Sequence, residues 1–246
     1  GCKKKDDTSL KAQSSIVEYT CISDSDSDKS FYVILKNYHG AYWETVIEGV
    51  SKAANEIDAS VYLGGIDNET DIEGQIELID EAIESGASGI LLAPANSDEL
   101  VESCKKARES GIYVVLIDSS INQCEFDACY MTDNVNAGQM AAKEMLGLLK
   151  EAGNLPSEEL EVGIMLSSDT SQAMVNRVSG FLEYWSGHSP AKWEIAQDIY
   201  LNDVNVEKAQ SDAKKLIDQH ENLKGIFGCN NTSTIGIAGE LLGKNR

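Results

Sequence analysis

The sequence predicts an α/β protein made of two lobes, each with helices on both faces of a parallel sheet. Three observations support this fold class. Continuous apolar runs, typical of strands buried on both faces, alternate with longer segments whose apolar residues have helical spacing. This alternation stops and starts again near residue 134. The chain has 246 residues, of which 42% are hydrophobic, and this length allows one large domain or two small ones.

The first block of alternating elements covers residues 31–133. It opens with the apolar run FYVILK, and apolar residues then recur at helical spacing from Trp43 to Ile57. Ser97 is predicted to be the N-cap of a later helix that ends at Gly111. The expected strands cover residues 31–36, 60–65, 89–94, 113–118 and 128–133, and helices are expected between the first four of them.

The second block covers residues 134–246 and repeats the same order of strand and helix. Its expected helices cover residues 134–150, 171–185, 206–220 and 233–243, and its expected strands cover residues 161–168, 193–201 and 224–230. Strand-helix alternation implies right-handed crossovers and a parallel sheet in each block. We therefore expect the chain to pass from one lobe to the other near residue 133.

Residues 1–30 are mostly polar and are predicted to form a solvated linker. The stretch SDSDSDKS is not a calcium loop, because Lys29 stands where such a loop needs glycine. A mildly apolar stretch around Ile16 and Tyr19 leaves a short extra strand open. Cys2 precedes three lysines and a polar stretch, so it is either a lipid-attachment residue or a chance cysteine.

Charge and missing motifs exclude several functional classes. Asp and Glu outnumber Lys and Arg by 41 to 20, and a surface this acidic repels nucleic acid. The chain lacks the phosphate-binding, dinucleotide-binding, nucleophile-elbow and HExxH motifs, so we expect neither an enzyme nor a cofactor. Six cysteines show no CxxC pair or zinc spacing, so no metal is expected. Cys124 and Cys129 are either bridged or free.

Polar and aromatic side chains follow several of the predicted strands. Ligands of open parallel sheets bind beyond the carboxyl ends of the strands. The candidate residues there are Asn37, His39, Tyr42, Trp43, Asp118, Ser119, Thr132, Asp133, Asn134, Arg177, Asn230 and Asn231. Such a set suits sugar hydroxyls, which donate to a carboxylate and accept from Arg or Asn, while an aromatic ring covers the C–H face of the sugar.

Simpler interpretations stay open for three of these residues. Trp43 also fits the buried stripe of its predicted helix. Asp118 can cap the turn that follows its strand, and Arg177 can pair with a carboxylate on the surface.

Six segments resemble, in their order and spacing, the type I periplasmic binding proteins of the ribose/galactose group, the solute receptors of ABC sugar importers. These segments are YWETVIEGVSKAA, SGILLAPANSDEL, VVLIDSS, TDNVNAGQMAA, NRVSGF and GIFGCNN. The resemblance covers residues 31–246 and implies two hinged, Rossmann-like lobes that close on a ligand.

The resemblance also implies a role for most candidate residues. Tyr42 and Trp43 match the aromatic pair that sandwiches the sugar, and Asp118 matches the hydroxyl-binding carboxylate. Arg177 and Asn230 match sugar-binding residues of the second lobe. Residues 132–134 match the hinge crossing, so Thr132 and Asp133 are assigned to the hinge. Two departures change the rim of the site: Ser119 stands where ribose binders often have arginine, and His39 and Gly40 stand where many members have asparagine.

The function implied by the resemblance is an extracytoplasmic solute-binding protein that delivers a monosaccharide-like ligand to the permease of an ABC importer. It implies a monomer without catalysis, held by lipid on Cys2 at the outer face of a bacterial membrane or in the periplasm. An alternative stays open, in which the same fold presents a sugar or furanosyl signal to a membrane histidine kinase. Members usually continue beyond LLGKNR, so the second lobe is expected to lack the usual C-terminal return segment.

Overall fold

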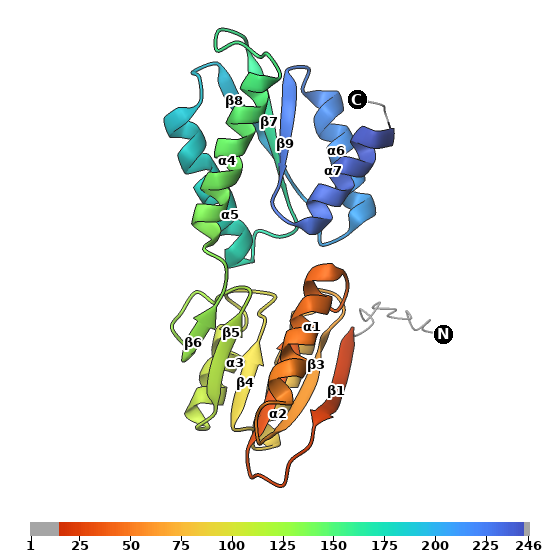
Figure 1. Ribbon diagram of the computed structural model, residues 1–246, viewed down its shortest axis with the longest axis vertical. Helices are drawn as coiled ribbons and strands as arrows, with labels where there is room; N and C mark the ends of the chain where they lie inside the picture. The colour runs from red at the N-terminus through yellow and green to blue at the C-terminus, as the bar shows by residue number, and fades with distance from the viewer. Residues whose placement is uncertain (1–14, 244–246) are drawn as a thin grey trace, which may run out of the picture.

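The computed structural model describes residues 15–243, which form two α/β lobes joined at residues 131–133 (Figure 1). The first lobe contains β1 (Ile16–Ser23), β2 (Ser30–Leu35), α1 (Ala41–Ala54), β3 (Ser60–Ile66), α2 (Ile72–Glu84), β4 (Gly89–Leu92), α3 (Val101–Glu109), β5 (Tyr113–Ile117) and β6 (Ala128–Tyr130). The second lobe contains α4 (Asn134–Glu151), β7 (Leu160–Leu166), α5 (Gln172–His188), β8 (Trp193–Leu201), α6 (Val206–Gln219), β9 (Leu223–Gly228) and α7 (Asn231–Gly243). The predicted lipid-attachment residue, Cys2, lies outside the described residues.

The first lobe is built on a six-stranded sheet in the order β1-β3-β2-β4-β5-β6. Strands β2 to β6 run parallel, as predicted, because each returns through a crossover. Helices α2 and α3 pack on one face around Leu78, Leu100 and Cys104. Helix α1 packs on the other face around Trp43 and Ala54. The carboxyl ends of the parallel strands therefore all point toward the second lobe (Figure 1).

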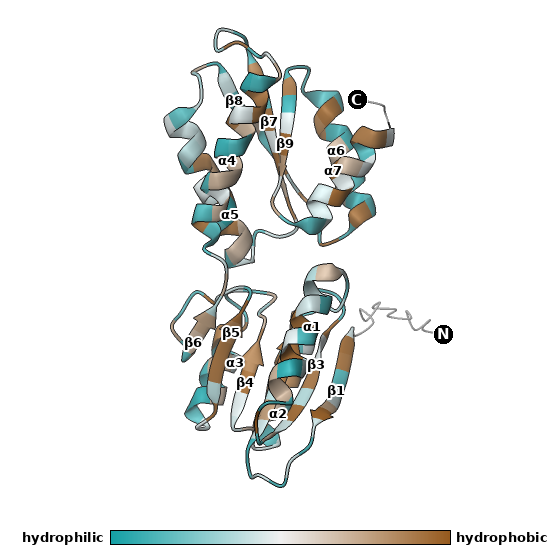
Figure 2. Ribbon diagram, viewed as in Figure 1, coloured by the Kyte–Doolittle hydropathy of each residue, from teal (hydrophilic) through white to brown (hydrophobic). Residues whose placement is uncertain are grey.

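The second lobe is built on a three-stranded parallel sheet in the order β8-β7-β9. Helices α4 and α5 cover one face, where Phe181 and Trp185 are stacked, and α6 and α7 cover the other. Apolar residues concentrate in the strands of both sheets, while the helices carry polar residues on their outer sides (Figure 2). The predicted α/β fold class, with parallel sheets flanked by helices, is confirmed.

The structure differs from the predicted linker within residues 15–30, while the first 14 residues of that linker lie outside the described residues. Residues 16–23 form β1, an antiparallel edge strand on β3, and Tyr19 donates a hydrogen bond of 2.8 Å to the backbone oxygen of Leu78. The short extra strand that the sequence left open is therefore present. The SDSDSDKS stretch that follows lies largely outside regular strands, and Ser25 contacts Ser60.

A second difference concerns Ser97, which does not cap α3. The helix begins four residues later, at Val101, and its N-cap position makes no side-chain hydrogen bond. The turn before it is held by Asn96, whose side-chain oxygen accepts from the backbone N–H groups of Asp98 and Glu99. Ser97 contacts the second lobe instead, as described below. Within residues 15–243, no helix has both the length and the apolar character needed to cross a membrane.

Candidate functional site

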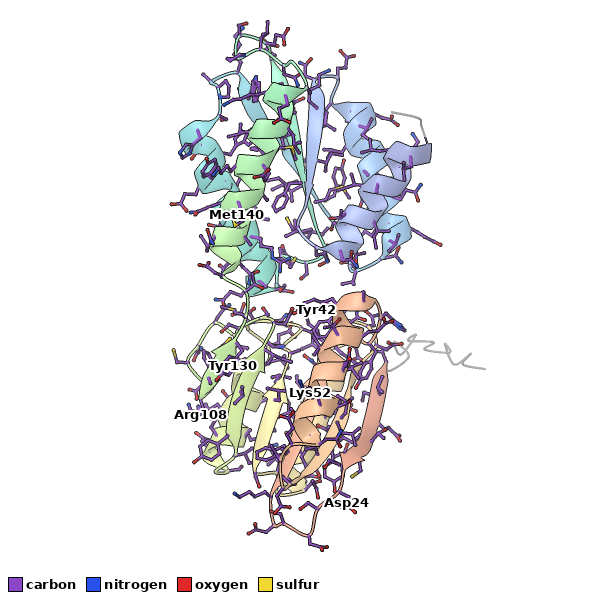
Figure 3. All side chains as sticks on the ribbon, viewed as in Figure 1. Asp24, Tyr42, Lys52, Arg108, Tyr130 and Met140 are labelled. Carbon is purple, nitrogen blue, oxygen red and sulfur yellow. The ribbon has the colours of Figure 1, made fainter. Side chains whose placement is uncertain are left out.

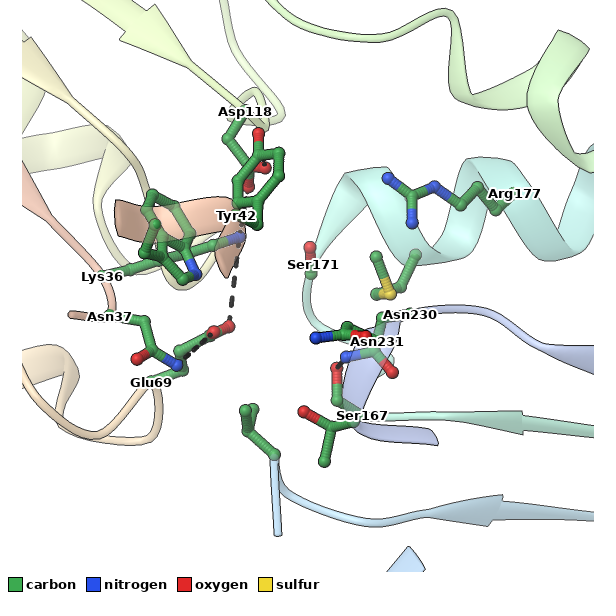
Figure 4. Close-up of a pocket in the computed structure, with 14 residues that line it drawn as sticks. Lys36, Asn37, Tyr42, Glu69, Asp118, Ser167, Ser171, Arg177, Asn230 and Asn231 are labelled. Atoms are coloured by element: carbon green, nitrogen blue, oxygen red, sulfur yellow. Dashed lines mark hydrogen bonds and ion pairs between the residues drawn. The ribbon is translucent and has the colours of Figure 1, made fainter. Parts of the chain in front are cut away.

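A cavity of about 170 Å³ lies between the two lobes, where the carboxyl ends of both sheets meet (Figure 4). We call its two sides the first-lobe wall and the second-lobe wall. The first-lobe wall consists of Lys36, Asn37, Tyr42, Trp43, Glu69 and Asp118. The second-lobe wall consists of Ser167, Ser171, Met174, Arg177, Val204, Asn230, Asn231 and Thr232. Six of the predicted ligand-binding residues thus come together from segments far apart in the sequence: Asn37, Tyr42, Trp43, Asp118, Arg177 and Asn230.

A buried ion pair between Lys36 and Asp118 organises the first-lobe wall. Lys36 follows β2 and its side chain is 6% exposed, while Asp118 follows β5 with a left-handed φ of 67°. The Lys36 Nζ lies 2.7 Å from Asp118 Oδ2 and 4.0 Å from Glu69 Oε2. Burial alone would raise the pKa of Asp118, but Lys36 and the Tyr42 hydroxyl hold that pKa below its usual value. For Lys36, burial acts in the opposite direction and lowers the pKa. The nearby carboxylates of Asp118 and Glu69 more than offset this effect, so the pKa of Lys36 is raised and the pair is ionised.

The aromatic pair stands at the start of α1, on the cavity side of this ion pair. The Tyr42 hydroxyl donates a hydrogen bond of 2.7 Å to Asp118 Oδ1, although the residue is 53% exposed. Trp43 is buried in the core beneath α1, as the buried-stripe interpretation predicts, and it also lines the cavity, so its contact with a ligand stays a prediction. The two rings meet edge to face, with centroids 5.1 Å apart.

Glu69 and Asn37 complete the charged side of the cavity. Asn37 Nδ2 donates to Glu69 Oε1 over 3.2 Å, and Asn37 Oδ1 accepts from the backbone N–H of His39. Sequence reasoning missed Lys36 and Glu69. Lys36 belongs to the predicted strand at 31–36, and the sequence predicts no ligand contact for the segment after the strand at 60–65. Applying the rule about carboxyl ends to that strand would have pointed to DNETD at 67–71.

Arg177 dominates the second-lobe wall and is held only by uncharged groups. Its Nε donates to Asn134 Oδ1 over 2.8 Å, and its Nη1 donates to the backbone oxygen of Cys229 over 2.7 Å. Among the ion pairs of residues 15–243, none involves Arg177. The surface ion pair that the sequence left open for this residue is therefore not formed. The guanidinium is fixed in direction, and its charge remains available to the cavity.

Hydroxyl and amide groups make up most of the remaining second-lobe wall. Asn230 Nδ2 donates to Ser167 Oγ over 2.9 Å, and Asn230 Oδ1 accepts from the backbone N–H of Ser233 in the first turn of α7. Ser171 precedes α5, and its buried Oγ has no hydrogen-bond partner within residues 15–243. These groups can donate and accept at once, as sugar hydroxyls require.

Three other predicted ligand-binding residues do not line the cavity. His39 is 75% exposed at the outer edge, where its Nε2 lies 2.7 Å from Asp67 Oδ1. Ser119 is fully buried and points away from the cavity, because successive residues at a strand end point in opposite directions. Its hydroxyl accepts a hydrogen bond from the backbone N–H of Ala173 instead. Asn134 is buried behind Arg177 and orients it. Direct ligand contact by these three residues finds no support in the geometry.

The chain crosses between the lobes next to this cavity. The predicted hinge residues Thr132 and Asp133 lie in the connection between β6 and α4, and Asp133 caps α4 by accepting from the backbone N–H of Asn136. Cys124 and Cys129 are free thiols, so the bridged alternative is wrong.

A second set of contacts joins the lobes at the N-terminus of α5. The backbone N–H of Ser97 donates to the oxygen of Thr170 over 3.0 Å, and Ser97 Oγ accepts from the backbone N–H of Gln172 over 2.9 Å. Ser119 Oγ accepts from Ala173 in the same way. First-lobe hydroxyls thus occupy two of the amide groups that the start of a helix leaves without intrahelical partners.

Comparison with known proteins decides the family. Residues 31–246 match the family model described as a periplasmic binding protein domain. The chain belongs to the periplasmic binding protein family. It is 26% identical over 215 residues to the D-allose-binding periplasmic protein of Escherichia coli, covering 85% of this chain and 66% of that protein. It is 25% identical over 223 residues to the ribose import binding protein of Bacillus subtilis, covering 87% of this chain and 66% of that protein.

The solved structures agree with the family match. An ABC transporter solute binding protein from Agrobacterium vitis with bound D-fucose is 29% identical, with a TM-score of 0.79 over 88% of this chain and 72% of the other. A carbohydrate transporter solute binding protein from Agrobacterium radiobacter, in complex with D-arabinose, has a TM-score of 0.83 at 23% identity, covering 90% and 73%. The second likeness shows the fold alone. The chain spans about two thirds of the length of the curated periplasmic binding proteins that it matches most fully.

Proposed function

We propose that this protein binds a monosaccharide between its two lobes, without making or breaking bonds, and hands it to the permease of an ABC importer. The observation that supports this most is the pairing of two complementary walls across one cavity. Asp118 and Lys36 face Arg177 and Asn230, so one small ligand can contact acceptors and donors from both lobes. Contacts made to both lobes at once favour closure about the crossing at Thr132 and Asp133.

Sugar hydroxyls fit this cavity better than an isolated charged group does. Across the whole cavity the two carboxylates, Glu69 and Asp118, are balanced in charge by Lys36 and Arg177, and the rest of the lining combines hydroxyls, amides and an aromatic face. A hydroxyl can donate and accept in the same site, and leaving any of these buried groups unpaired would weaken binding. The named sugars of the similar proteins, which include allose, ribose and fucose, belong to this chemical class.

The experiment that tests the proposal is a thermal-shift screen with D-allose, D-ribose, D-fucose and other monosaccharides. A sugar present at ~100 times its Kd should stabilise the folded protein by about 2.7 kcal/mol, because it binds the native state alone. Arg177→Met should remove most of the shift at the same sugar concentration, because its Kd is expected to rise by roughly 100-fold. Arg108→Met is the matched control, since Arg108 pairs with Glu125 and Asp127 on the outer side of the first lobe, away from Tyr42 (Figure 3). If no monosaccharide shifts the wild-type protein, the proposal is wrong.

The proposal extends to cellular location through Cys2. The cysteine precedes Lys3, Lys4, Lys5 and a polar stretch, a pattern that suits lipid attachment and a tether at the outer face of a bacterial membrane. Metabolic labelling with a radioactive fatty acid should mark the wild-type protein and leave Cys2→Ala unlabelled. Labelling of both proteins, or of neither, would contradict the anchor and leave the sugar-binding proposal intact.

A further inference from the structure

The Asp118 carboxylate already has a protein donor on each of its oxygens. Oδ2 takes the Lys36 ammonium at 2.7 Å, and Oδ1 takes the Tyr42 hydroxyl at 2.7 Å. The Asp118 side chain is 16% exposed, and in Figure 4 the Tyr42 hydroxyl lies beside its carboxylate at the cavity. A ligand hydroxyl can therefore bind Asp118 Oδ1 at a position where the Tyr42 hydroxyl, itself an O–H donor, already lies.

The two donors differ in how firmly they are held. Lys36 is buried, and Glu69 as well as Asp118 stabilises its charge. Tyr42 is half exposed, and among the described residues its hydroxyl has one hydrogen-bond partner, Asp118. It stands in the first turn of α1, which follows Gly40 and has no side-chain cap. Of the two groups on Asp118, the tyrosine is the one that a ligand can replace.

We infer that the Tyr42 hydroxyl holds the place of a ligand hydroxyl on Asp118 in the free protein and leaves when the ligand binds. This inference rests on the proposed function. Replacing one O–H donor by another leaves Asp118 with a hydrogen bond on each oxygen in both states, so the buried carboxylate is never left unpaired. The buried Lys36 ammonium holds the other oxygen of Asp118 at 2.7 Å, so the donor moves and the acceptor stays.

Displacement has a consequence for specificity. A sugar that carries a hydroxyl opposite Asp118 replaces the tyrosine bond with an equivalent one. A deoxy sugar lacking that hydroxyl cannot, so it either leaves the tyrosine in place or leaves Oδ1 unpaired. The freed Tyr42 ring is then available to lie against the C–H face of the bound sugar, beside Trp43.

The test is Tyr42→Phe, measured by calorimetric titration with a monosaccharide that shifts the wild-type protein. The variant should bind more tightly, by about three- to tenfold, because the free protein no longer holds the bond that the ligand has to replace. The melting temperature of the free variant should fall at the same time. Tyr42→Ala should bind more weakly than Tyr42→Phe, since it also removes the ring. Tyr113→Phe, at an exposed position on β5 outside the cavity, is the matched control and should change neither quantity.

Each result decides between displacement and a direct role of the hydroxyl. If the tyrosine hydroxyl stays and contacts the sugar, Tyr42→Phe will bind more weakly or equally, which overturns the inference while the proposed function stands. If no monosaccharide binds the wild-type protein, both fail. A second measurement uses the wild-type protein alone, with the ring carbon that bears the Tyr42 hydroxyl labelled with ¹³C. When sugar is added, the NMR chemical shift of this carbon should move toward that of a solvated tyrosine. An unchanged shift in the bound state would also contradict displacement.

Discussion

The two walls of the cavity hold their charged side chains in different ways. The first-lobe wall buries Lys36, Glu69 and Asp118 in one ion-paired network. The second-lobe wall carries one cation, Arg177, which uncharged oxygens hold in place. Charges of the first wall depend on one another, so removing one leaves the others unpaired in a buried site. Arg177 makes no ion pair among the described residues and acts on Asp118 only as the weakest of the influences that lower the pKa of that carboxyl. We therefore expect changes in the first wall to cost stability, and changes in the second to cost affinity.

The largest expected effect is that of Lys36→Met, which removes the cation from the first-lobe wall. Breaking a buried ion pair costs about 3–5 kcal/mol, because the remaining carboxylate is left buried without a partner. Urea denaturation at neutral pH measures the loss of unfolding free energy. Lys106→Met is the matched control, because Lys106 makes an exposed ion pair of 2.7 Å with Asp80 and should cost less than about 1 kcal/mol. Equal losses in the two variants would contradict the difference between the walls.

Arg177→Met should show the opposite pattern, with a large loss of affinity and a smaller loss of stability. We expect the Kd of the bound monosaccharide to rise by roughly 100-fold, since hydrogen bonds from a charged donor are worth ~1.5–3 kcal/mol. The unfolding free energy should fall by less than in Lys36→Met, by ~1–3 kcal/mol, because two buried acceptors lose their donor. Asn134→Ala should weaken binding by about tenfold, because Arg177 loses its orienting partner. Calorimetric titration measures the Kd of the two variants, and urea denaturation measures their unfolding free energy. If Arg177→Met loses as much unfolding free energy as Lys36→Met, the expected difference between the two walls is contradicted.

A third way to sharpen the comparison is acid titration of stability. The pKa of Asp118 in the folded protein lies below its unfolded value of about 3.9, so the unfolded state binds the proton first as the pH falls. The stabilisation by this pair is thus present above about pH 4 and is lost as the pH falls through the folded pKa. Unfolding free energies measured from pH 6 to 2 should fall more steeply for the wild-type protein than for Asp118→Asn. Parallel curves would show that the pair contributes nothing at neutral pH.

The smallest effect is expected for His39→Ala at the outer edge of the cavity. His39 is 75% exposed and contacts Asp67 beyond the ligand-facing walls, so its removal should change Kd by less than about twofold. The same calorimetric titration checks this. A tenfold loss would mean that the site extends outward to the rim, as the sequence alone predicted.

Sequence patterns predicted most elements because burial against a sheet restricts where apolar residues can stand. The runs at 31–36 and 161–168 could hardly be anything other than strands, and both are strands in the structure. The edge strand β1 was harder to recognise, because one of its faces is exposed and its sequence is only mildly apolar.

The site could be predicted in part, and the errors share a cause. Asp118 directly follows β5, and Arg177 lies near the start of the helix after β7, so both predicted residues line the cavity at the carboxyl ends of the strands. Lys36 was missed because a long aliphatic stem at a strand end resembles the strand itself, and its carboxylate partners lie far along the chain. Ser119 was assigned to the ligand because sequence does not say which of two adjacent side chains points into a cavity.

The contacts of Ser97 and Ser119 with the start of α5 also restrict how the molecule can move. Two bodies joined at a single point can swing and twist in every direction. Within residues 15–243, this group of hydrogen bonds attaches the second lobe to the first in addition to the covalent crossing at residues 131–133. Any widening of the cavity that moves the start of α5 away from the first lobe has to break these hydrogen bonds, so they oppose that direction of motion.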